Sequence, residues 1–495
     1  MSEARVTEGL PPVKSWEKRT LVAITAAFVC VVALWAILTP LYDSPDEAIH
    51  VNSAIRLAEG GGWPAPGDAQ LLAMVVAAEA ERDVVAEERS TFHELQEAHP
   101  GYDGLDQMTQ HPPLYYAYAA AVLHAVDYLD IRADRALLAL RLAGLLFALL
   151  LPFFAWSAVR RLTGSPRAAI LAAASLLAVP RLANILGSVS NDTLAVAAVS
   201  AVVYFGVRMM TGDKSWWSVV GMGSTLAVAL LTKSTALPLV GFVGVVLLVW
   251  PAGLRLGRRL LRATVAMAVA SCGGWWWIRN VLLYGTLQPA GLLYDANPWP
   301  EGEGPSVIFF TENLWHRISN SFWGGFGHLD TPLPYFLTDV ITVVCLVVVA
   351  AFAIRRGPLL WQSVTLAAVP LVCVIALIAM TWPSYVRSQL PSGMQGRYFF
   401  VVMVPLIALS TLAWRRLVAP SSHRRAGVVL LLSFAFLAAL GLGVAFRGFY
   451  PAGLGAWLAL SPAGAPATLL VVAATGVTSA LALALTVRAM RTAAG

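Results

Sequence analysis

Two adjacent carboxylates and an imidazole stand directly after the first long apolar run of the chain. The run covers residues 21–41, and the polar segment after it contains Asp46, Glu47 and His50. A carboxylate can take a proton from a hydroxyl group as a general base. The segment also suits an ordinary helix start, because Pro45 fits a first helical position and acidic residues in a first turn favour the helix dipole. The rest of the chain must therefore decide between catalysis and a solvated helix start.

The composition is that of a polytopic membrane protein. Of the 495 residues, 58% are hydrophobic and only 13% are charged, whereas soluble domains carry about 25% charged residues. The net charge is +6, but the basic residues stand in short clusters between apolar runs. They therefore indicate membrane topology and not nucleic-acid binding. The four cysteines form neither a disulfide framework nor a metal-binding pattern, since all of them lie in apolar segments.

Apolar runs of about 20 residues, each long enough to cross a bilayer, recur along the chain. We expect twelve spans, at roughly 21–41, 136–158, 167–186, 192–210, 216–232, 235–250, 263–281, 336–354, 360–381, 398–414, 426–446 and 466–487. Basic clusters such as Arg160-Arg161 and Arg415-Arg416 fall on alternate loops, which places these loops and both termini in the cytoplasm. The sequence thus predicts a cytoplasmic N-terminus over 1–20 and a single transmembrane domain over 21–495.

Two large extracytoplasmic loops follow from this topology, at about 42–135 and 282–335. The first is expected to hold amphipathic helices. One of them, 115–129, is apolar enough to span but is interrupted by His124 and Asp127. A full crossing would place the next basic cluster outside, so we expect a helix of partial depth.

Further isolated polar residues lie at the same expected outer face. Lone ionisable groups at membrane level are costly and tend to be functional. Each has a structural alternative: long basic side chains can extend to the headgroups, Asn or Asp can cap a helix, and prolines can start one. Their coincidence on one side favours a shared site, which would comprise His111, Tyr116, Asn191, Asp192, Lys233, Arg279, Arg397 and Tyr398 in addition to the first segment.

These groups suit the transfer of a sugar from a lipid phosphate. A carboxylate would act as the base toward an acceptor hydroxyl, while Lys and Arg would hold the phosphate and stabilise its growing charge. A transporter or flippase for a lipid-linked sugar is the alternative, but it would place polar sites near the midplane on broken helices, often in two related halves. A structural scaffold would not need these charges on one side.

Several motifs resemble the GT-C superfamily of integral-membrane glycosyltransferases. Two of them resemble the bacterial DUF2142 group in particular, and protein mannosyltransferases and lipid A aminoarabinose transferases are more distant. Together the matches extend from about residue 44 to 400. The motifs are Asp46-Glu47, His111–Tyr116, Asn191-Asp192 and Gly396–Phe399 for the superfamily, and Trp277–Gly285 and Ser321–Gly327 for the DUF2142 group.

The resemblance implies a GT-C-like helical bundle in a bacterial cell membrane. It implies an inverting displacement from a polyprenyl-phosphate sugar donor to a glycan, lipid or protein acceptor of the cell envelope. Some members of the superfamily need a divalent metal and others do not, so cofactor use stays open. Asp46 would be the base with Glu47 as its neighbour; Lys233, Arg279, Arg397 and Arg387 would bind the donor phosphate; His50, His111, Tyr116, Asn191, Asp192, Trp323 and Tyr398 would contact substrate.

Overall fold

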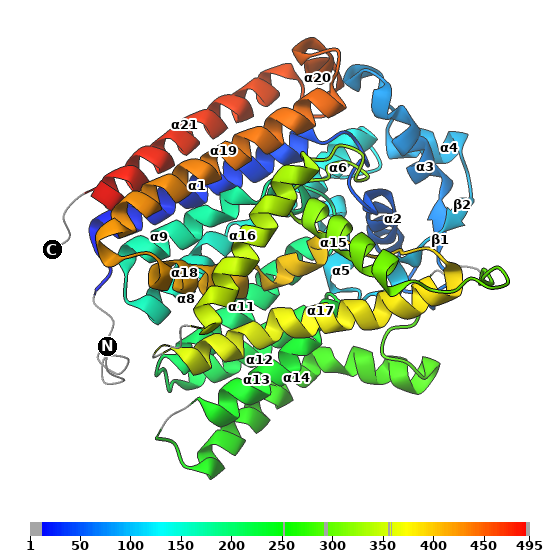
Figure 1. The fold of residues 1–495 in the computed structure, drawn as a ribbon. Coiled ribbons are helices and arrows are strands. Elements are labelled where there is room, and N and C mark those ends of the chain that lie inside the picture. The colour runs from blue at the N-terminus through cyan, green and yellow to red at the C-terminus, as the bar shows by residue number, and fades with distance from the viewer. Residues whose placement is uncertain (1–11, 251–252, 292–295, 355–356, 358, 492–495) are drawn as a thin grey trace.

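Most of the described chain is helical (Figure 1). The structure is a computed structural model that describes residues 12–250, 253–291, 296–354, 357 and 359–491, so part of the expected N-terminal segment 1–20 lies outside the described residues. The first part of the chain forms α1 (Ser15–Leu38), α2 (Glu47–Ala58), β1 (Gln70–Leu72), α3 (Ala73–Ala80), η2 (Glu81–Asp83), η3 (Ala86–Glu88), α4 (Phe92–Ala98), β2 (Tyr102–Leu105), η4 (Gln107–Gln110), α5 (Leu114–Ala125), α6 (Ala133–Ala143), α7 (Leu145–Ala148), α8 (Leu151–Thr163), α9 (Pro166–Ala174), η5 (Ser175–Ala178), α10 (Pro180–Leu186) and α11 (Asp192–Met210).

The second part continues the helical bundle. It forms α12 (Trp216–Leu230), η6 (Ser234–Ala236), α13 (Pro238–Val249), α14 (Leu256–Tyr284), α15 (Val307–Trp323), α16 (Tyr335–Ile354), α17 (Leu360–Ser388), η7 (Gly396–Val402), α18 (Met403–Leu417), η8 (Pro420–Ser422), α19 (His423–Phe449), α20 (Leu454–Leu460) and α21 (Ala465–Arg491).

Seven helical segments of the described chain are long and apolar enough to cross a membrane. An eighth candidate consists of 166–178 and 180–186, which meet at an angle of 74°. The bend falls at Pro180, which lacks an N–H and disfavours the helical conformation for Val179 before it. Every expected apolar run coincides with a helix or this broken pair, while the count of twelve crossings stays a prediction. The seven are 15–38, 133–163, 192–210, 360–388, 396–417, 420–449 and 465–491.

The bundle has two different ends. The long helices α1, α19 and α21 run side by side, and the beginning of α1 and the end of α21 lie at the same end (Figure 1). At the other end of α1, helices α2 to α5 and the strands form a separate layer, here called the cap (residues 47–125). An apolar cluster that includes Phe92 and Tyr116 of the cap also contains Tyr42 of the preceding turn and residues of α6.

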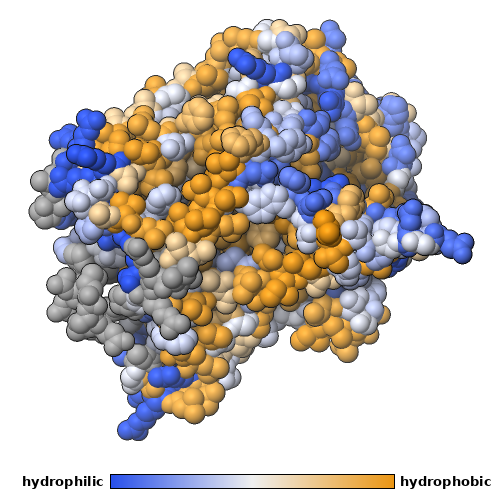
Figure 2. Space-filling view, viewed as in Figure 1, coloured by the Kyte–Doolittle hydropathy of each residue, from blue (hydrophilic) through white to orange (hydrophobic). Residues whose placement is uncertain are grey.

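The outer helices expose apolar side chains, as lipid contact requires. Only 22% of the most apolar window of α17 and 17% of that of α21 is buried. Figure 2 shows apolar residues over much of the visible face of the bundle. In water such a surface would drive aggregation, so it fits a hydrocarbon environment.

The two long loops are more structured than the sequence suggested. In the first, β1 pairs antiparallel with β2, with Gln70 opposite Leu105, a small sheet that was not expected. Helix α5 has 12 residues and is about 18 Å long, too short for a hydrocarbon core of about 30 Å, which agrees with a helix of partial depth. The second loop contains α15, a helix of 17 residues.

Candidate functional site

The turn between α1 and α2 carries Asp46 in an unusual backbone conformation. Asp46 precedes the first residue of α2 with φ of 63°, and Tyr42 in the same turn has φ of 58°. The left-handed conformation costs a non-glycine residue roughly 1–2 kcal/mol, although Asp tolerates it better than most. Surrounding contacts must therefore hold this turn in place.

Asp46 forms an ion pair with Arg397, a residue 351 positions later in the chain. Arg397 lies in η7, and its Nη1 also donates to the Pro45 carbonyl oxygen at 3.2 Å. The Arg397 side chain is 5% exposed and that of Asp46 is 30% exposed, so the carboxylate remains reachable. Burial raises the pKa of the Asp46 carboxyl, but the Arg397 guanidinium outweighs burial and holds the pKa at about 2. Asp46 is therefore ionised at neutral pH.

A second ion pair lies beside the first. Lys233 Nζ contacts Asp192 Oδ1 at 2.7 Å, and both side chains are buried. Tyr398 joins the two pairs, because its ring centroid is 5.8 Å from Lys233 Nζ and 5.7 Å from Arg397 Cζ. We call Asp46, Asp192, Lys233 and Arg397 the charge cluster. The structure thus brings together four charged residues that the sequence placed on separate segments.

Aromatic and imidazole side chains adjoin the charge cluster on the side of the cap. His50, one helical turn after Asp46 on α2, has its Nδ1 2.9 Å from the Tyr116 hydroxyl, and the two rings stack with centroids 5.8 Å apart. Trp63 packs on Tyr116 at 4.9 Å and donates from Nε1 to the His111 carbonyl oxygen. Burial lowers the pKa of His50 to about 3, so this imidazole is neutral at neutral pH.

Several buried polar atoms in and near the charge cluster have no hydrogen-bond partner in the described structure, and Arg397 Nε is one of them. Others belong to Asn191, whose amide oxygen and nitrogen are both unpaired, and to His111, whose Nδ1 is unpaired. Unpaired buried polar groups are costly and call for an explanation, such as a ligand that is yet to bind. Asn191 and His111 were expected to contact substrate, and that role stays a prediction; their unpaired atoms are available for hydrogen bonds to a ligand.

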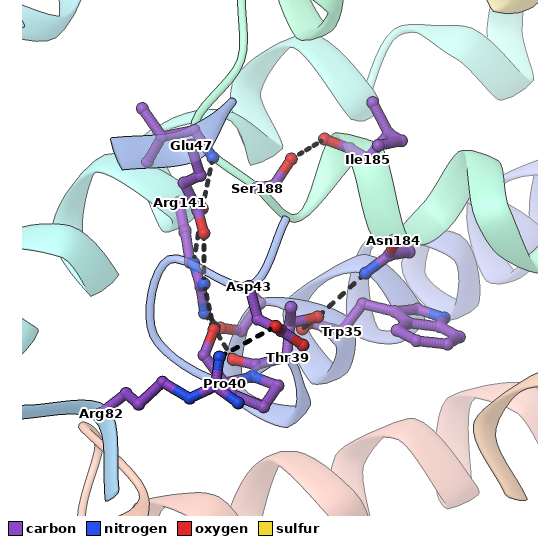
Figure 3. Close-up of polar contacts among 12 residues, drawn as sticks. Trp35, Thr39, Pro40, Asp43, Glu47, Arg82, Arg141, Asn184, Ile185 and Ser188 are labelled. Atoms are coloured by element: carbon purple, nitrogen blue, oxygen red, sulfur yellow. Dashed lines mark hydrogen bonds and ion pairs between the residues drawn. The ribbon is translucent and has the colours of Figure 1, made fainter. Parts of the chain in front are cut away.

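Glu47 does not face the charge cluster. Its carboxylate is fully buried and pairs with Arg141, with Nη2 2.6 Å from Oε2 and Nε 2.9 Å from Oε1 (Figure 3). The amide of Val189 also donates to Oε1 at 2.8 Å. The structure therefore separates the two neighbouring carboxylates: Asp46 reaches the charge cluster, and Glu47 anchors the turn.

The two remaining candidate phosphate ligands lie apart from these contacts. The guanidinium of Arg279 on α14 stacks on the rings of Trp276 and Tyr284, at 5.0 and 5.7 Å. Arg387, near the end of α17, is exposed. In the described part of the chain, neither forms a hydrogen bond or ion pair with a residue of the charge cluster. Their proposed role in phosphate binding therefore gains no support from the geometry.

Trp323, expected to contact substrate, is buried at the end of α15. Its Nε1 donates to Thr342 Oγ1 at 2.8 Å. Phe326, three residues later, packs on Trp35 with ring centroids 4.7 Å apart. In the structure this aromatic segment packs within the bundle.

Two buried residues that the sequence analysis overlooked support the site. Arg141 holds Glu47, and it stands inside an apolar run, which is the signal that could have found it. Asp106 accepts hydrogen bonds from Asn52 at 2.6 Å and Ser53 at 2.7 Å, tying α2 to the segment before α5. Nothing in its local sequence separates Asp106 from the exposed acidic residues of the same loop.

A cavity of about 100 Å³ lies on the other side of the turn. It is lined by Asp43, Arg82, Asp330 and Tyr450 among others, and no member of the charge cluster lines it. Arg82 Nη1 is 3.3 Å from Asp43 Oδ1, as Figure 3 shows. Burial raises the pKa of the Asp43 carboxyl to about 6.

The carboxylates of the site do not fit a divalent metal in this arrangement. Asp46 and Asp192 already pair with cations, and Glu47 pairs with Arg141. Among the residues described, no group of three or more His, Cys, Asp or Glu side chains is arranged to hold a metal ion. The mechanism proposed below therefore includes no step through a metal.

The chain is similar to several solved structures at low sequence identity. ArnT from Cupriavidus metallidurans, solved bound to undecaprenyl phosphate, is 19% identical, with 94% of this chain and 77% of that chain covered and a TM-score of 0.45. Arabinosyltransferase EmbB from Mycobacterium smegmatis is 13% identical, with 98% of this chain and 42% of that chain covered and a TM-score of 0.43. The oligosaccharyltransferase of Archaeoglobus fulgidus is 14% identical, with 96% of this chain and 55% of that chain covered and a TM-score of 0.41. No curated protein matches.

The family itself follows from a match along the sequence. The model of a predicted membrane protein family, DUF2142, matches residues 29–407. This range is well over half of the chain and contains the whole charge cluster. It confirms the family that the motifs suggested, and the chain therefore belongs to the DUF2142 family of membrane proteins.

Proposed function

We propose that this protein is an inverting glycosyltransferase of the GT-C type. It moves a sugar from a polyprenyl-phosphate donor to a cell-envelope acceptor on the extracytoplasmic side of the membrane. The observation that carries the proposal is the charge cluster: a reachable carboxylate, Asp46, stands beside two buried cations, Arg397 and Lys233. One site thus offers a base and a phosphate clamp, the two parts that transfer from a lipid phosphate requires.

In the proposed reaction, Asp46 takes the proton of the acceptor hydroxyl as its oxygen attacks the anomeric carbon. The bond to the phosphate oxygen breaks, and the lipid phosphate leaves with the electron pair. A transition state of oxocarbenium character is expected. Arg397 and Lys233 stabilise the charge that grows on the leaving phosphate. Asn191 and His111, unpaired in the structure, are available for hydrogen bonds to the sugar.

Donor binding would also prepare the base. In the structure Arg397 donates to Asp46 and keeps its pKa low. A donor phosphate drawn to Arg397 brings a negative charge beside Asp46, which raises the pKa of the carboxyl. Asp46 then becomes a stronger base only when a donor is present.

The test is sugar transfer by the purified protein in lipid nanodiscs. A panel of synthetic polyprenyl-phosphate pentoses and hexoses would serve as donors, and envelope glycans and lipids from a strain lacking the gene would serve as acceptors. We expect labelled sugar in the acceptor fraction and an equal amount of free polyprenyl phosphate. Absence of transfer from every donor, with protein shown to be folded, would contradict the proposal.

One observation favours a flippase as the second candidate. The break between α9 and α10 bends a candidate span by 74° and carries the buried Arg181, and broken helices with charges are typical of transporters. A flippase would move a labelled lipid-linked sugar across a liposome bilayer and release no lipid phosphate. A transferase would release lipid phosphate, so one assay separates the two functions.

The proposed orientation predicts opposite labelling of two exposed positions. Asp103 lies in the cap and Arg424 is the second residue of α19, and both are exposed. In a variant without native cysteines, Asp103→Cys should react with a membrane-impermeant maleimide in intact cells. Arg424→Cys should react only after the membrane is opened. The reverse pattern would place the charge cluster on the cytoplasmic side.

The pH dependence should differ between kcat/KM and kcat. Because the base must be deprotonated, activity is lost as pH falls through the pKa of Asp46. That pKa is about 2 in the free protein, so Asp46 should cause no loss of kcat/KM between pH 7 and 5. The pKa seen in kcat should be higher, because bound donor competes for Arg397. Both rates are measured from pH 4.5 to 8 in Asp43→Asn, which removes the group of pKa about 6. A fall of kcat/KM toward low pH as large as that of kcat would contradict the prediction.

A further inference from the structure

The guanidinium of Arg141 has every N–H group engaged, although it is wholly buried. Two N–H groups hold Glu47. The other three hold backbone carbonyl oxygens near the end of α1: Ala36 at 2.9 Å, Thr39 at 2.7 Å and Pro40 at 2.7 Å. An arginine has five N–H donors, so none is left for a substrate. Figure 3 shows the Arg141 side chain between Glu47 and the end of α1.

These contacts join segments that carry the two acids of the charge cluster. Glu47 is the residue after Asp46, so fixing Glu47 fixes the first turn of α2. Glu47 Oε1 also accepts from the amide of Val189, three residues before Asp192. One buried ion pair thus fixes the relative positions of three segments: the end of α1, the turn that carries Asp46, and the turn that leads to Asp192.

We propose that Glu47 and Arg141 are positioning residues for the general base Asp46, and that Glu47 takes no part in the chemistry itself. This inference rests on the proposed function. The Glu47 carboxylate is 0% exposed and both of its oxygens are engaged, so it cannot reach an acceptor. The neighbouring turn has two residues with left-handed backbone, Tyr42 and Asp46, and strained conformations persist only where their surroundings hold them.

The same two spans offer a matched control at their other end. Glu17, near the start of α1, pairs with Arg160 of α8 at 2.8 Å, and this pair is also buried. Trp156 Nε1 donates to the same carboxylate oxygen of Glu17 at 3.0 Å. Arg160 and Arg141 both lie in the span 133–163 and both contact α1 or its end, Arg160 through Glu17 and Arg141 through backbone carbonyl oxygens. Only Arg141 also holds Glu47, the first residue of α2, beside the charge cluster. A purely structural effect of a lost buried ion pair should therefore appear equally in both.

The experiment measures kcat per folded molecule, donor KM and melting temperature for four variants: Glu47→Gln, Arg141→Lys, their double variant and the control Glu17→Gln. Loss of positioning should lower kcat about 10- to 100-fold, the scale of a displacement of about 1 Å in a reacting group. Donor KM should change little. Glu17→Gln should lower the melting temperature comparably and leave kcat unchanged.

The double variant distinguishes positioning from a direct role. If the pair acts as a unit, Glu47→Gln with Arg141→Lys should cost no more than the worse single variant. If Glu47 acted on the substrate by itself, the two losses would multiply, which would overturn the inference. Unchanged kcat in Glu47→Gln, or an equal loss in Glu17→Gln, would overturn it as well.

A second measurement needs no substrate and so separates this inference from the proposed function. Hydrogen exchange of a peptide covering residues 39–50 should be faster in folded Glu47→Gln than in wild type, while Glu17→Gln should leave it unchanged. Unchanged exchange in Glu47→Gln would refute the positioning role even if no donor is ever found. Faster exchange together with no sugar transfer by wild type would leave the positioning of the turn intact and refute the transferase.

Discussion

Asparagine in place of Asp46 is expected to lower sugar transfer by about 10²–10⁴-fold, the usual cost of losing a general base. The amide has nearly the same shape as the carboxylate and can still accept a hydrogen bond from Arg397. It cannot take the proton of the acceptor hydroxyl. Because Arg397 and Lys233 remain in place, donor binding should survive, and the loss should appear in kcat.

The measurement is donor affinity and turnover on the same purified protein. Asp43→Asn is the matched control, because Asp43 stands in the same turn but lines the neighbouring cavity. It should retain most of its activity at pH 7. An Asp46→Asn protein that transferred sugar at nearly the wild-type rate would remove Asp46 from the role of base and make Asp43 the next carboxylate to examine.

The members of the charge cluster could be identified in the sequence because ionisable residues are rare beside or within membrane-spanning runs. Lys233 directly follows one apolar run and Arg397 directly precedes another. An ionisable side chain at such a place needs a partner or a function. The sequence could place them at one face of the bundle. It could not pair them, because Asp46 meets Arg397 across 351 positions and Asp192 meets Lys233 across 41.

Arg279 and Arg387 carry the same sequence signal but do not contact the charge cluster in the described structure. Both stand near helix ends, as Arg397 does near its helix start, but the direction of a side chain depends on helix rotation within the bundle. Arg279 stacks on aromatic rings and Arg387 is exposed. Neither orientation can be worked out from hydropathy, which gives the length of a span and not its rotation.

Helices could be predicted from the sequence where a long run of apolar residues indicates them. Apolar runs of about 20 residues located the spans, because hydrophobic length is set by bilayer thickness. The strand β1 has only three residues, too few for an alternating pattern to be visible. The bend before Pro180 had a local cause, the missing N–H of proline, and could have been inferred.

Removal of the Arg397 side chain is the second change expected to have a large effect. Arg397→Ala deletes a charge-assisted, bidentate donor group, and such groups stabilise phosphate both before and during the reaction. We expect turnover to fall about 10²–10³-fold, the cost of one lost donor to a developing anion. Unlike Asp46→Asn, this variant should also bind donor more weakly.

The comparison among arginines makes this prediction specific to one cation. Arg397→Ala, Arg279→Ala and Arg387→Ala would be assayed together for binding of farnesyl phosphate and for turnover with the best donor of the panel. Only Arg397→Ala should lose both donor binding and turnover, because Arg397 alone of these three arginines contacts Asp46, the carboxylate proposed as the base. Arg397→Lys keeps the charge but not the planar fork, so it should fall between wild type and Arg397→Ala. If Arg279→Ala or Arg387→Ala lost donor binding while Arg397→Ala kept it, the phosphate would lie outside the charge cluster, and Arg397 would lose its role as the cation that binds the leaving group.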